Sequence, residues 1–263
     1  METLGQKFER LARILATLRG PGGCPWDKEQ TYKNLNPYMV EEVHEVIEAI
    51  DHNDFPELKE ELGDLLMHIC FHSQLATEDK HFTIADVIDA QCEKLVRRHP
   101  HVFGDETAET SEKVLENWEK IKQKERTDKS KSEKKTLLSG LPKSLPALVK
   151  ALRIGEKTHR VGFDWPTPEG VLKKVDEELG ELRNAIASDG TRIEDELGDL
   201  LFTLANLARH FNIDPETALR KSSDRFTKRF EWIENHVTVQ NKKFQDLSAQ
   251  EWDQLWNEAK VKE

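Results

Sequence analysis

Two pairs of carboxylates in the carboxy-terminal part of the chain have a spacing that could bind a metal ion. Glu178 and Glu181 are three residues apart in one segment, and Glu196 and Asp199 are three apart in the next. Residues three apart share a helix face, and the turn-forming residues 187–190 predict two antiparallel helices on which the four acids converge. Converging carboxylates repel one another unless they bind protons or cations. Oxygen ligands without Cys or His nearby are typical of Mg²⁺ or Mn²⁺ sites.

The amino-terminal part of the chain repeats this pattern of acids. The six residues Glu-Leu-Gly-Asp-Leu-Leu occur at 61–66 and again at 196–201. Three further segments match in the same order at separations of 131 to 138 residues: 41–45 with 177–181, 93–98 with 224–229, and 118–122 with 256–260. Ordered matches at a nearly constant separation indicate an internal duplication. The second set of candidate metal ligands is Glu42, Glu45, Glu61 and Asp64.

A single acidic pair is a weak indication of a metal site, because such pairs are common on the solvated helix faces of acidic chains. Its occurrence in converging, duplicated sets favours a metal site over a solvated surface. A glycine lies inside each of the repeated segments, Gly63 in one and Gly198 in the other. Since a mid-helix glycine costs about 1 kcal/mol relative to alanine, we expect another backbone or a ligand to approach closely at both.

A basic cluster follows the acids in each half. In the carboxy half, Lys221, Arg225 and Lys228 follow steps of four and three residues and share one helix face, with Arg229 beside it. Alone, such a cluster is as typical of a solvated, ion-paired face as of a binding site. Beside a metal site it predicts contacts with the outer phosphates of a nucleotide, which an arginine can bind through two parallel hydrogen bonds.

The basic cluster of the amino half is less complete. Its members include Arg97 and Arg98, but Ala90 stands where the carboxy half has Lys221. The His-Pro-His run after Arg98 also predicts an interruption of the helix, whereas residues 226–230 can continue theirs. We therefore expect the carboxy half to be the main catalytic half and the amino half to turn over slowly or to support assembly.

Helices must position these groups, and the chain is patterned for helices almost throughout. Apolar residues recur every three or four positions in segments such as 4–18 and 39–50, as in amphipathic helices. The best candidate for a strand is the short run 236–240. The run 122–135 has no aliphatic or aromatic residue and predicts an exposed linker. The expected fold is all-α, with two tandem helical-bundle domains at 1–121 and 137–263 and a charged linker at 122–136.

Composition excludes several classes of protein. Among 263 residues, 39 Lys and Arg against 50 Asp and Glu give a net charge of -11, which argues against stable nucleic-acid binding through phosphate neutralisation. The longest strongly apolar stretch, 200–208, is far short of the roughly 20 residues of a membrane span. No secretory signal is visible at the start, and three separated cysteines without a CxxC motif argue against disulfides or a cysteine zinc site. A cytoplasmic location is expected.

At these motifs the chain resembles the MazG family of nucleoside triphosphate pyrophosphohydrolases, over essentially its whole length and in the duplicated, two-domain form. Further motifs carry the resemblance: Gly-Cys-Pro-Trp-Asp at 23–27, Arg-Arg-His-Pro-His-Val-Phe at 97–103, Ser-Leu-Pro-Ala-Leu at 144–148 and Val-Gly-Phe-Asp-Trp at 161–165. The resemblance implies an all-α NTP pyrophosphohydrolase fold and a homodimer. It also implies Mg²⁺-dependent conversion of NTPs and dNTPs to NMP and pyrophosphate, with broad base tolerance.

The resemblance also implies roles for individual residues. The catalytic metal ligands would be Glu178, Glu181, Glu196 and Asp199, and the nucleotide contacts would include Lys174, Lys221, Arg225 and Trp256. Attack at the α-phosphorus, with release of pyrophosphate, follows from the resemblance alone. Two metal ions about 3.5–4 Å apart could activate water and stabilise the leaving oxygen, and the identity of the general base stays open.

Two alternatives compete with this interpretation. A helical interaction module would use its acidic faces only for solubility and would show no Mg²⁺-dependent turnover. A di-iron carboxylate protein would use steps such as Glu41-x-x-His44, but Gly180 stands where the duplication would repeat His44. We rank the pyrophosphohydrolase first, the interaction module second and the di-iron protein third.

Overall fold

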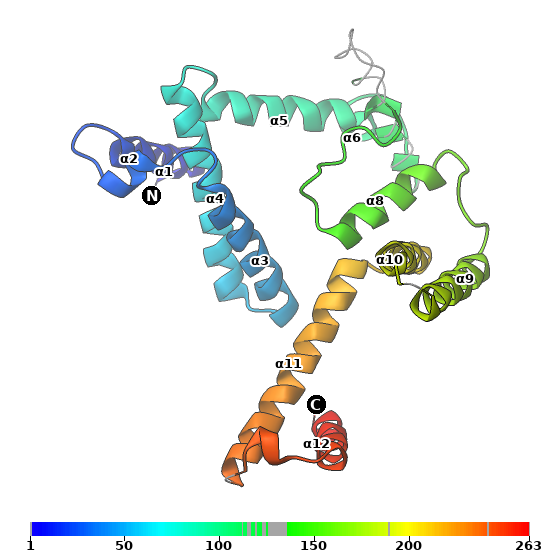
Figure 1. Ribbon diagram of the computed structural model, residues 1–263. Helices are drawn as coiled ribbons and strands as arrows, with labels where there is room; N and C mark the ends of the chain where they lie inside the picture. Colours follow the sequence, from blue (N-terminus) through cyan, green and yellow to red (C-terminus); the bar gives the residue numbers. More distant parts are fainter. Residues whose placement is uncertain are drawn as a thin grey trace. The chain divides into compact units, whose positions relative to one another are not determined.

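The computed structural model describes residues 2–111, 113–114, 117–118, 120–122, 125, 136–188, 190–240 and 242–262. Every regular element within these residues is a helix, so the expectation of an all-α protein is confirmed (Figure 1). The chain divides into two compact units, Met1–Lys131 and Ser132–Glu263. The linker expected at 122–136 lies almost entirely outside the described residues, and the domain boundaries drawn beside it stay a prediction.

The described part of the first unit is built around a hairpin of two helices. Its helices are α1 (Leu4–Arg19), α2 (Pro25–Glu29), α3 (Asn36–His52), α4 (Phe55–Glu78), α5 (Ile84–Arg98) and α6 (Pro100–Phe103). Asn53 ends α3 in the left-handed conformation, with φ of 56°. The next residue, Asp54, begins α4 by accepting a hydrogen bond from the Glu57 backbone N–H at 3.1 Å. This tight turn lays α3 and α4 side by side.

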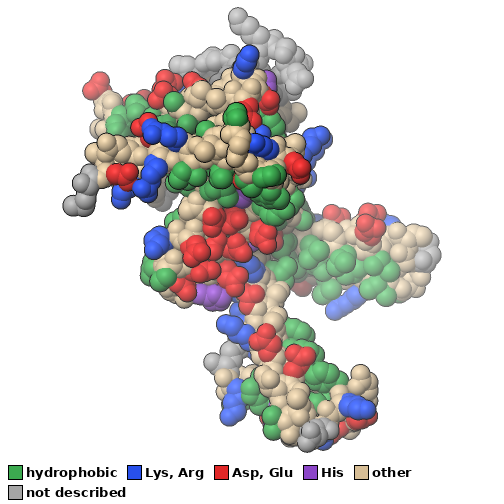
Figure 2. Space-filling model, turned by 90° about the vertical axis from the view of Figure 1, so that its left-hand side faces the viewer, with side chains coloured by type: hydrophobic (Ala, Val, Ile, Leu, Met, Phe, Trp, Pro, Cys, Tyr) green, Lys and Arg blue, Asp and Glu red, His purple; other side chains and the backbone are tan. Residues whose placement is uncertain are grey.

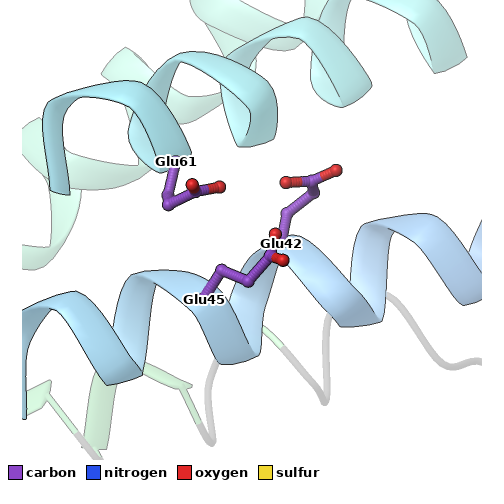
Figure 3. Close-up of side chains that lie close together, drawn as sticks. All are labelled: Glu42, Glu45 and Glu61. Carbon is purple, nitrogen blue, oxygen red and sulfur yellow. The ribbon is translucent and has the colours of Figure 1, made fainter. Parts of the chain in front are cut away.

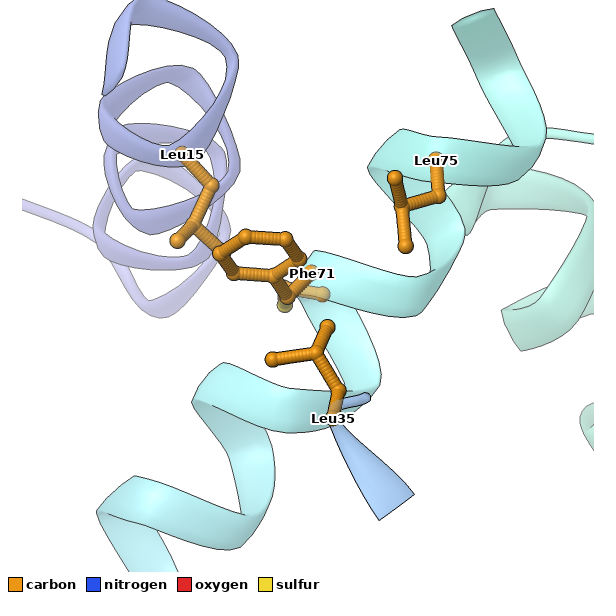
Figure 4. Packing of buried hydrophobic residues seen from close by; sticks show 5 residues of the cluster. Leu15, Leu35, Phe71 and Leu75 are labelled. Atoms are coloured by element: carbon orange, nitrogen blue, oxygen red, sulfur yellow. The ribbon is translucent and has the colours of Figure 1, made fainter. Parts of the chain in front are cut away.

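The core of the first unit lies between α1 and α4. Its buried members are Leu15, Leu35, Cys70, Phe71 and Leu75. Figure 4 shows the side chains of Leu15, Leu35 and Leu75 around the ring of Phe71, which is 2% exposed. This packing fixes one end of the hairpin. The helix α5 ends at Arg98, as the sequence predicts, because Pro100 cannot continue it.

The second unit repeats the hairpin. Its described elements are α8 (Ala147–His159), α9 (Pro168–Ala187), α10 (Ile193–His210), α11 (Pro215–Val239), the short 3₁₀ helix η1 (Phe244–Asp246) and α12 (Ala249–Val261). The helices α9 and α10 pack along each other, and α8 packs on α10. Gly190 lies in the turn between α9 and α10. Its φ of 75° is a left-handed conformation, which glycine adopts at little cost.

The long helix α11 carries a second apolar cluster. One end of α11 lies near α8 and α10, and α12 packs against its other half (Figure 1). The buried members of the cluster are Ile233, Val237, Leu255 and Ala259. The strand considered at 236–240 is therefore wrong, since α11 runs through to Val239. Ile233 and Val237 are four residues apart and both face α12, which is the spacing of a helix.

In the described part of the chain, no other backbone or side chain approaches the two repeated glycines closely, so the approach of a ligand there stays a prediction. A Cβ atom added to Gly63 or Gly198 would meet no other atom within 4 Å. The leucines beside them are exposed as well, Leu62 at 51% and Leu197 at 45%. The repeated segment thus presents an uncovered apolar face, and the glycines lie on helices whose outer side is open.

Candidate metal and nucleotide site

The hairpin of the first unit brings three of its four predicted acids together. Carboxylate oxygens of Glu42, Glu45 and Glu61 all lie within 4.8 Å of one another. Figure 3 shows Glu61 on α4 facing Glu42 and Glu45 on α3. Asp64 lies outside this closest group, but its charge acts on both Glu42 and Glu61. The i,i+3 spacing on two paired helices therefore produces the convergence that the sequence predicts.

The electrostatics of this amino cluster show that its negative charge is poorly compensated. Burial raises the pKa of Glu61 to about 7, with added repulsion from Glu45, Glu57, Glu42 and Asp64. Burial and the charges of Asp64 and Glu45 also raise the pKa of Glu42. One buried oxygen of Glu61 has no hydrogen-bond partner among the described residues. A buried, repelling set of carboxylates is an arrangement that a cation would stabilise.

The hairpin of the second unit forms the matching carboxy cluster. Carboxylate oxygens of Glu178, Glu196 and Asp199 lie within 4.8 Å of one another. Glu178 is 4% exposed and Glu196 is 1% exposed, whereas Asp199 is open to solvent. Glu181 lies outside this closest group, and its side chain is hydrogen-bonded to that of Glu196. All four predicted acids thus belong to one neighbourhood on α9 and α10.

Two cations lie against the carboxy cluster. The Lys174 Nζ atom is 2.8 Å from Glu178 and 2.7 Å from Glu177, and its hydrogen bonds to Glu177 and Glu178 raise the pKa of Lys174. Arg192 forms an ion pair with Glu196. Burial still raises the pKa of Glu196, and Glu181 and Glu178 add to the shift while Arg192 opposes it.

Sequence reasoning found Lys174 only through a family resemblance and missed Arg192. The signal for Arg192 was present, because Arg192 and Glu196 are four residues apart at the start of a helix, a spacing that pairs opposite charges. A cavity of about 690 Å³ opens beside this pair, and its lining includes Glu181, Asn184, Thr191, Arg192 and Glu196. The cavity is large enough for a small polar ligand at the edge of the acid cluster.

The predicted nucleotide contacts lie on other helices. Lys221 and Arg225 are exposed on α11, and Trp256 lies on α12, within the apolar cluster of Ile233 and its neighbours. The Trp256 ring centre is 5.0 Å from that of Phe226, and the Arg229 guanidinium lies 5.7 Å from it. The structure thus brings Lys174 to the acids and places the other three predicted contacts on the α11–α12 arm.

Two basic residues of the amino half pair with a glutamate of their own unit. Arg97 Nε is 2.8 Å from Glu125 Oε1, and Arg98 is 2.6 Å from Glu125 Oε2. These arginines, Arg98 first, lower the pKa of Glu125 to about 2. Lys94, Arg97 and Arg98 correspond to Arg225, Lys228 and Arg229 of the carboxy half, and the two arginines of the amino half are held by Glu125.

The positions of the histidines bear on the di-iron alternative. Among the described residues, neither group of closely spaced potential metal ligands includes a histidine, and His44 is exposed on α3. The Glu41-x-x-His44 step on which the di-iron alternative rests therefore does not contribute its histidine to either acid cluster. Acidic side chains on the face shown in Figure 2 gather into a patch rather than being evenly spread. No helix in the described ranges is both long and apolar enough to cross a bilayer.

Comparison with known proteins matches these features. The profile of the MazG nucleotide pyrophosphohydrolase domain matches residues 30–103 and again residues 166–234. The chain belongs to the MazG family. Both matched ranges contain one complete set of four acids, so the MazG domain occurs twice, as the internal duplication predicts.

Curated MazG relatives align over nearly the whole chain. The nucleoside triphosphate pyrophosphohydrolase/pyrophosphatase MazG of Thermotoga maritima is 44% identical over 260 residues, covering 99% of this chain and 98% of the relative. The nucleoside triphosphate pyrophosphohydrolase of Escherichia coli K12 is 41% identical over 262 residues, covering 98% of each. The uncharacterized protein YabN of Bacillus subtilis is 43% identical, and this MazG chain covers 53% of its length.

Proposed function

We propose that the protein hydrolyses nucleoside and deoxynucleoside triphosphates to the monophosphate and pyrophosphate, with Mg²⁺ or Mn²⁺ bound at the carboxy cluster and with broad base tolerance. The observation that carries the proposal is the convergence of Glu178, Glu196 and Asp199 on one helical hairpin. Its MazG family membership and the names of its relatives support the same activity.

The residues of the carboxy cluster fit a divalent metal. The donor set consists of carboxylate oxygens, which suit Mg²⁺ and Mn²⁺. One buried oxygen of Glu178 and one of Glu196 have no hydrogen-bond partner among the described residues, so each has an unused ligand position. We assign metal binding to Glu178, Glu181, Glu196 and Asp199. A bound metal would neutralise phosphate charge and lower the pKa of a coordinated water.

The cations beside the cluster have two roles in this proposal. Without substrate, Lys174 and Arg192 compensate the charges of Glu178 and Glu196. With a divalent metal bound by the acids, Lys174 and Arg192 would be available to contact phosphate oxygens. Lys221 and Arg225 would bind the outer phosphates, and Trp256 would stack on the base. Pairing with phosphate suits the fork of arginine and the point charge of lysine.

The structure supports the carboxy half as the main catalytic half. Arg97 and Arg98 are paired with Glu125 in the amino half, and α5 ends at Arg98. The matching basic residues of the carboxy half lie in the middle of α11, which continues for ten residues beyond Arg229 to Val239. The amino cluster would then bind metal without an equivalent set of phosphate contacts.

A homodimer and a cytoplasmic location belong to the same proposal. Exposed leucines of the repeated segment, including Leu62 and Leu197, form apolar faces that a second copy could cover. Cys24, Cys70 and Cys92 all lie in the described residues, and all three are unpaired. Free thiols are usual in a reducing compartment.

One incubation tests the proposed activity. The full-length protein is mixed with Mg²⁺ and a panel of NTPs and dNTPs, and the products are separated. We expect NMP and pyrophosphate from several bases. Release of NDP and phosphate would contradict attack at the α-phosphorus. No turnover, together with no change in melting temperature on adding Mg²⁺ and NTP, would favour the interaction module instead.

A further inference from the structure

The glutamate that begins each acid pair has a different nitrogen neighbour in the two halves. In the carboxy half, Glu178 is paired with Lys174, one turn earlier on the same helix, at 2.8 Å. The position that corresponds to Lys174 in the amino half, 136 residues earlier, is Tyr38. Tyr38 supplies no cation, and its ring lies edge-on to Trp26 with the centroids 6.1 Å apart. Glu42 therefore lacks the partner that its counterpart has.

A buried histidine from the neighbouring helix faces Glu42 instead. The Nε2 atom of His68, on α4, is 3.7 Å from Glu42 Oε1. His68 is 3% exposed, and its Nδ1 atom has no hydrogen-bond partner among the described residues. The corresponding position of the carboxy half, 135 residues later, is Thr203, which is also buried. Each half thus has either the lysine or the histidine, but not both.

The geometry suits His68 as a hydrogen-bond donor to Glu42 better than as a member of the metal-binding group. Burial and the neighbouring His72 lower the pKa of His68, against a smaller effect of Asp64. A charged imidazole donates from both ring nitrogens, so the Nε2 atom can donate to Glu42 whether or not the ring is charged. A neutral imidazole has one N–H, and the nitrogen that faces a carboxylate is the one that gains from carrying it. His68 is not a member of the close group formed by Glu42, Glu45 and Glu61.

We propose that His68 is the positioning residue of the amino-half metal site, and that it holds the Glu42 carboxylate toward Glu45 and Glu61 by donating its Nε2–H. The proposal rests on the proposed function, in which these acids bind a divalent cation. The distance of 3.7 Å is longer than the 2.7–3.2 Å of an ordinary N–H···O bond. A small movement of the Glu42 side chain would close it. Ligating carboxylates are commonly oriented by such outer hydrogen bonds, whose loss weakens metal binding roughly 10- to 100-fold.

The affinity for Mn²⁺ tests this role in the full-length chain. The carboxy cluster is first disabled by Glu178→Gln and Glu181→Gln, so that bound Mn²⁺, measured by electron paramagnetic resonance, reports the amino half. In this background we expect His68→Leu and His68→Thr to weaken Mn²⁺ binding about tenfold. The Thr variant copies the residue of the carboxy half. His68→Gln, whose amide nitrogen reaches about as far as Nε2, is expected to keep the affinity within about twofold, because it restores the donor.

Controls separate this proposal from the one on which it depends. His72 lies one turn further along α4 and stacks on Tyr32 at 6.1 Å, so His72→Leu should leave the affinity unchanged. Glu42→Gln with Glu45→Gln should abolish binding; persistence of tight binding there would overturn the amino-half metal site itself. If that control behaves as expected but Leu, Thr and Gln at position 68 all bind alike, His68 has only a packing role. Melting temperatures without metal identify any variant that has lost its fold, and the remaining variants then decide.

Discussion

Proton competition at the amino cluster gives a prediction whose size follows from the structure. Glu61 has a pKa of about 7, raised from 4.5, and it must be ionised to bind a cation. Between pH 6 and pH 8 the ionised fraction of such a group rises from about 10% to about 90%. We therefore expect the affinity of the amino cluster for Mn²⁺ to increase about tenfold across this interval. A glutamate with a pKa of 4.5 would already be ionised at pH 6 and would give almost no change.

The measurement is a Mn²⁺ titration at several pH values, in the full-length chain carrying Glu178→Gln and Glu181→Gln. Glu61→Gln should weaken binding and remove most of the pH dependence. The matched control is Glu60→Gln, an exposed neighbour on α4, which should keep the slope. An affinity that does not change between pH 6 and pH 8 would refute the argument that burial and repulsion raise the pKa of Glu61.

The same shift fixes the sign of a stability effect. The folded chain holds the proton of Glu61 more tightly than the unfolded chain, so this group makes the metal-free fold less stable as the pH rises from about 4.5 to about 7. A saturating divalent cation binds only the folded state and should oppose this loss. Thermal melting with and without Mn²⁺ at both ends of the interval checks the sign.

Three further predictions concern the carboxy half. Single substitutions of its acids should each remove most turnover, while the melting temperature without metal holds or rises. The four variants are Glu178→Gln, Glu181→Gln, Glu196→Gln and Asp199→Asn. A wild-type rate at saturating Mg²⁺ in all four would exclude the metal site. Lys221→Ala and Arg225→Ala should weaken NTP binding more than NMP binding, and equal effects on the two ligands would count against contact with the outer phosphates. The double variant Glu178→Gln/Glu181→Gln should lose far more activity than Glu42→Gln/Glu45→Gln when both are assayed on the same NTPs; the opposite order would assign the activity to the amino half.

Local periodicity was enough to predict the helices and the grouping of the acids. Glu42 and Glu45 share a helix face because they are three residues apart. The short connection at Asn53 and Asp54 makes α4 return alongside α3. The interruption after Arg98 followed from one proline. In these cases a rule that acts over a few residues decides the outcome.

Contacts between helices could not be predicted in the same way. The approach of His68 to Glu42 depends on how α3 and α4 are rotated against each other, and the pairing of Arg98 with Glu125 joins residues 27 apart. The run at 236–240 has alternating apolar residues, but it is helical, and Val237 packs against α12. The free-energy cost of Gly63 in a helix indicates that some contact compensates for it. That cost does not tell whether the compensating partner belongs to the same chain.

The length and placement of α11 mean that a small rotation at one of its ends would displace the other end much further. Its 25 residues span about 37 Å at 1.5 Å per residue, with one end near α8 and α10 and the other packed against α12. A rotation of α11 by about 10° about its amino-terminal end would move its carboxy-terminal end by about 6 Å. Side chains near the pivot, such as Lys221, would travel little, whereas Trp256, which packs on Phe226 in the middle of α11, would move by about 3 Å. One triphosphate bound by both the hairpin and the α11–α12 arm would fix that angle, and a small rotation near the phosphates would then move the Trp256 ring relative to the nucleobase.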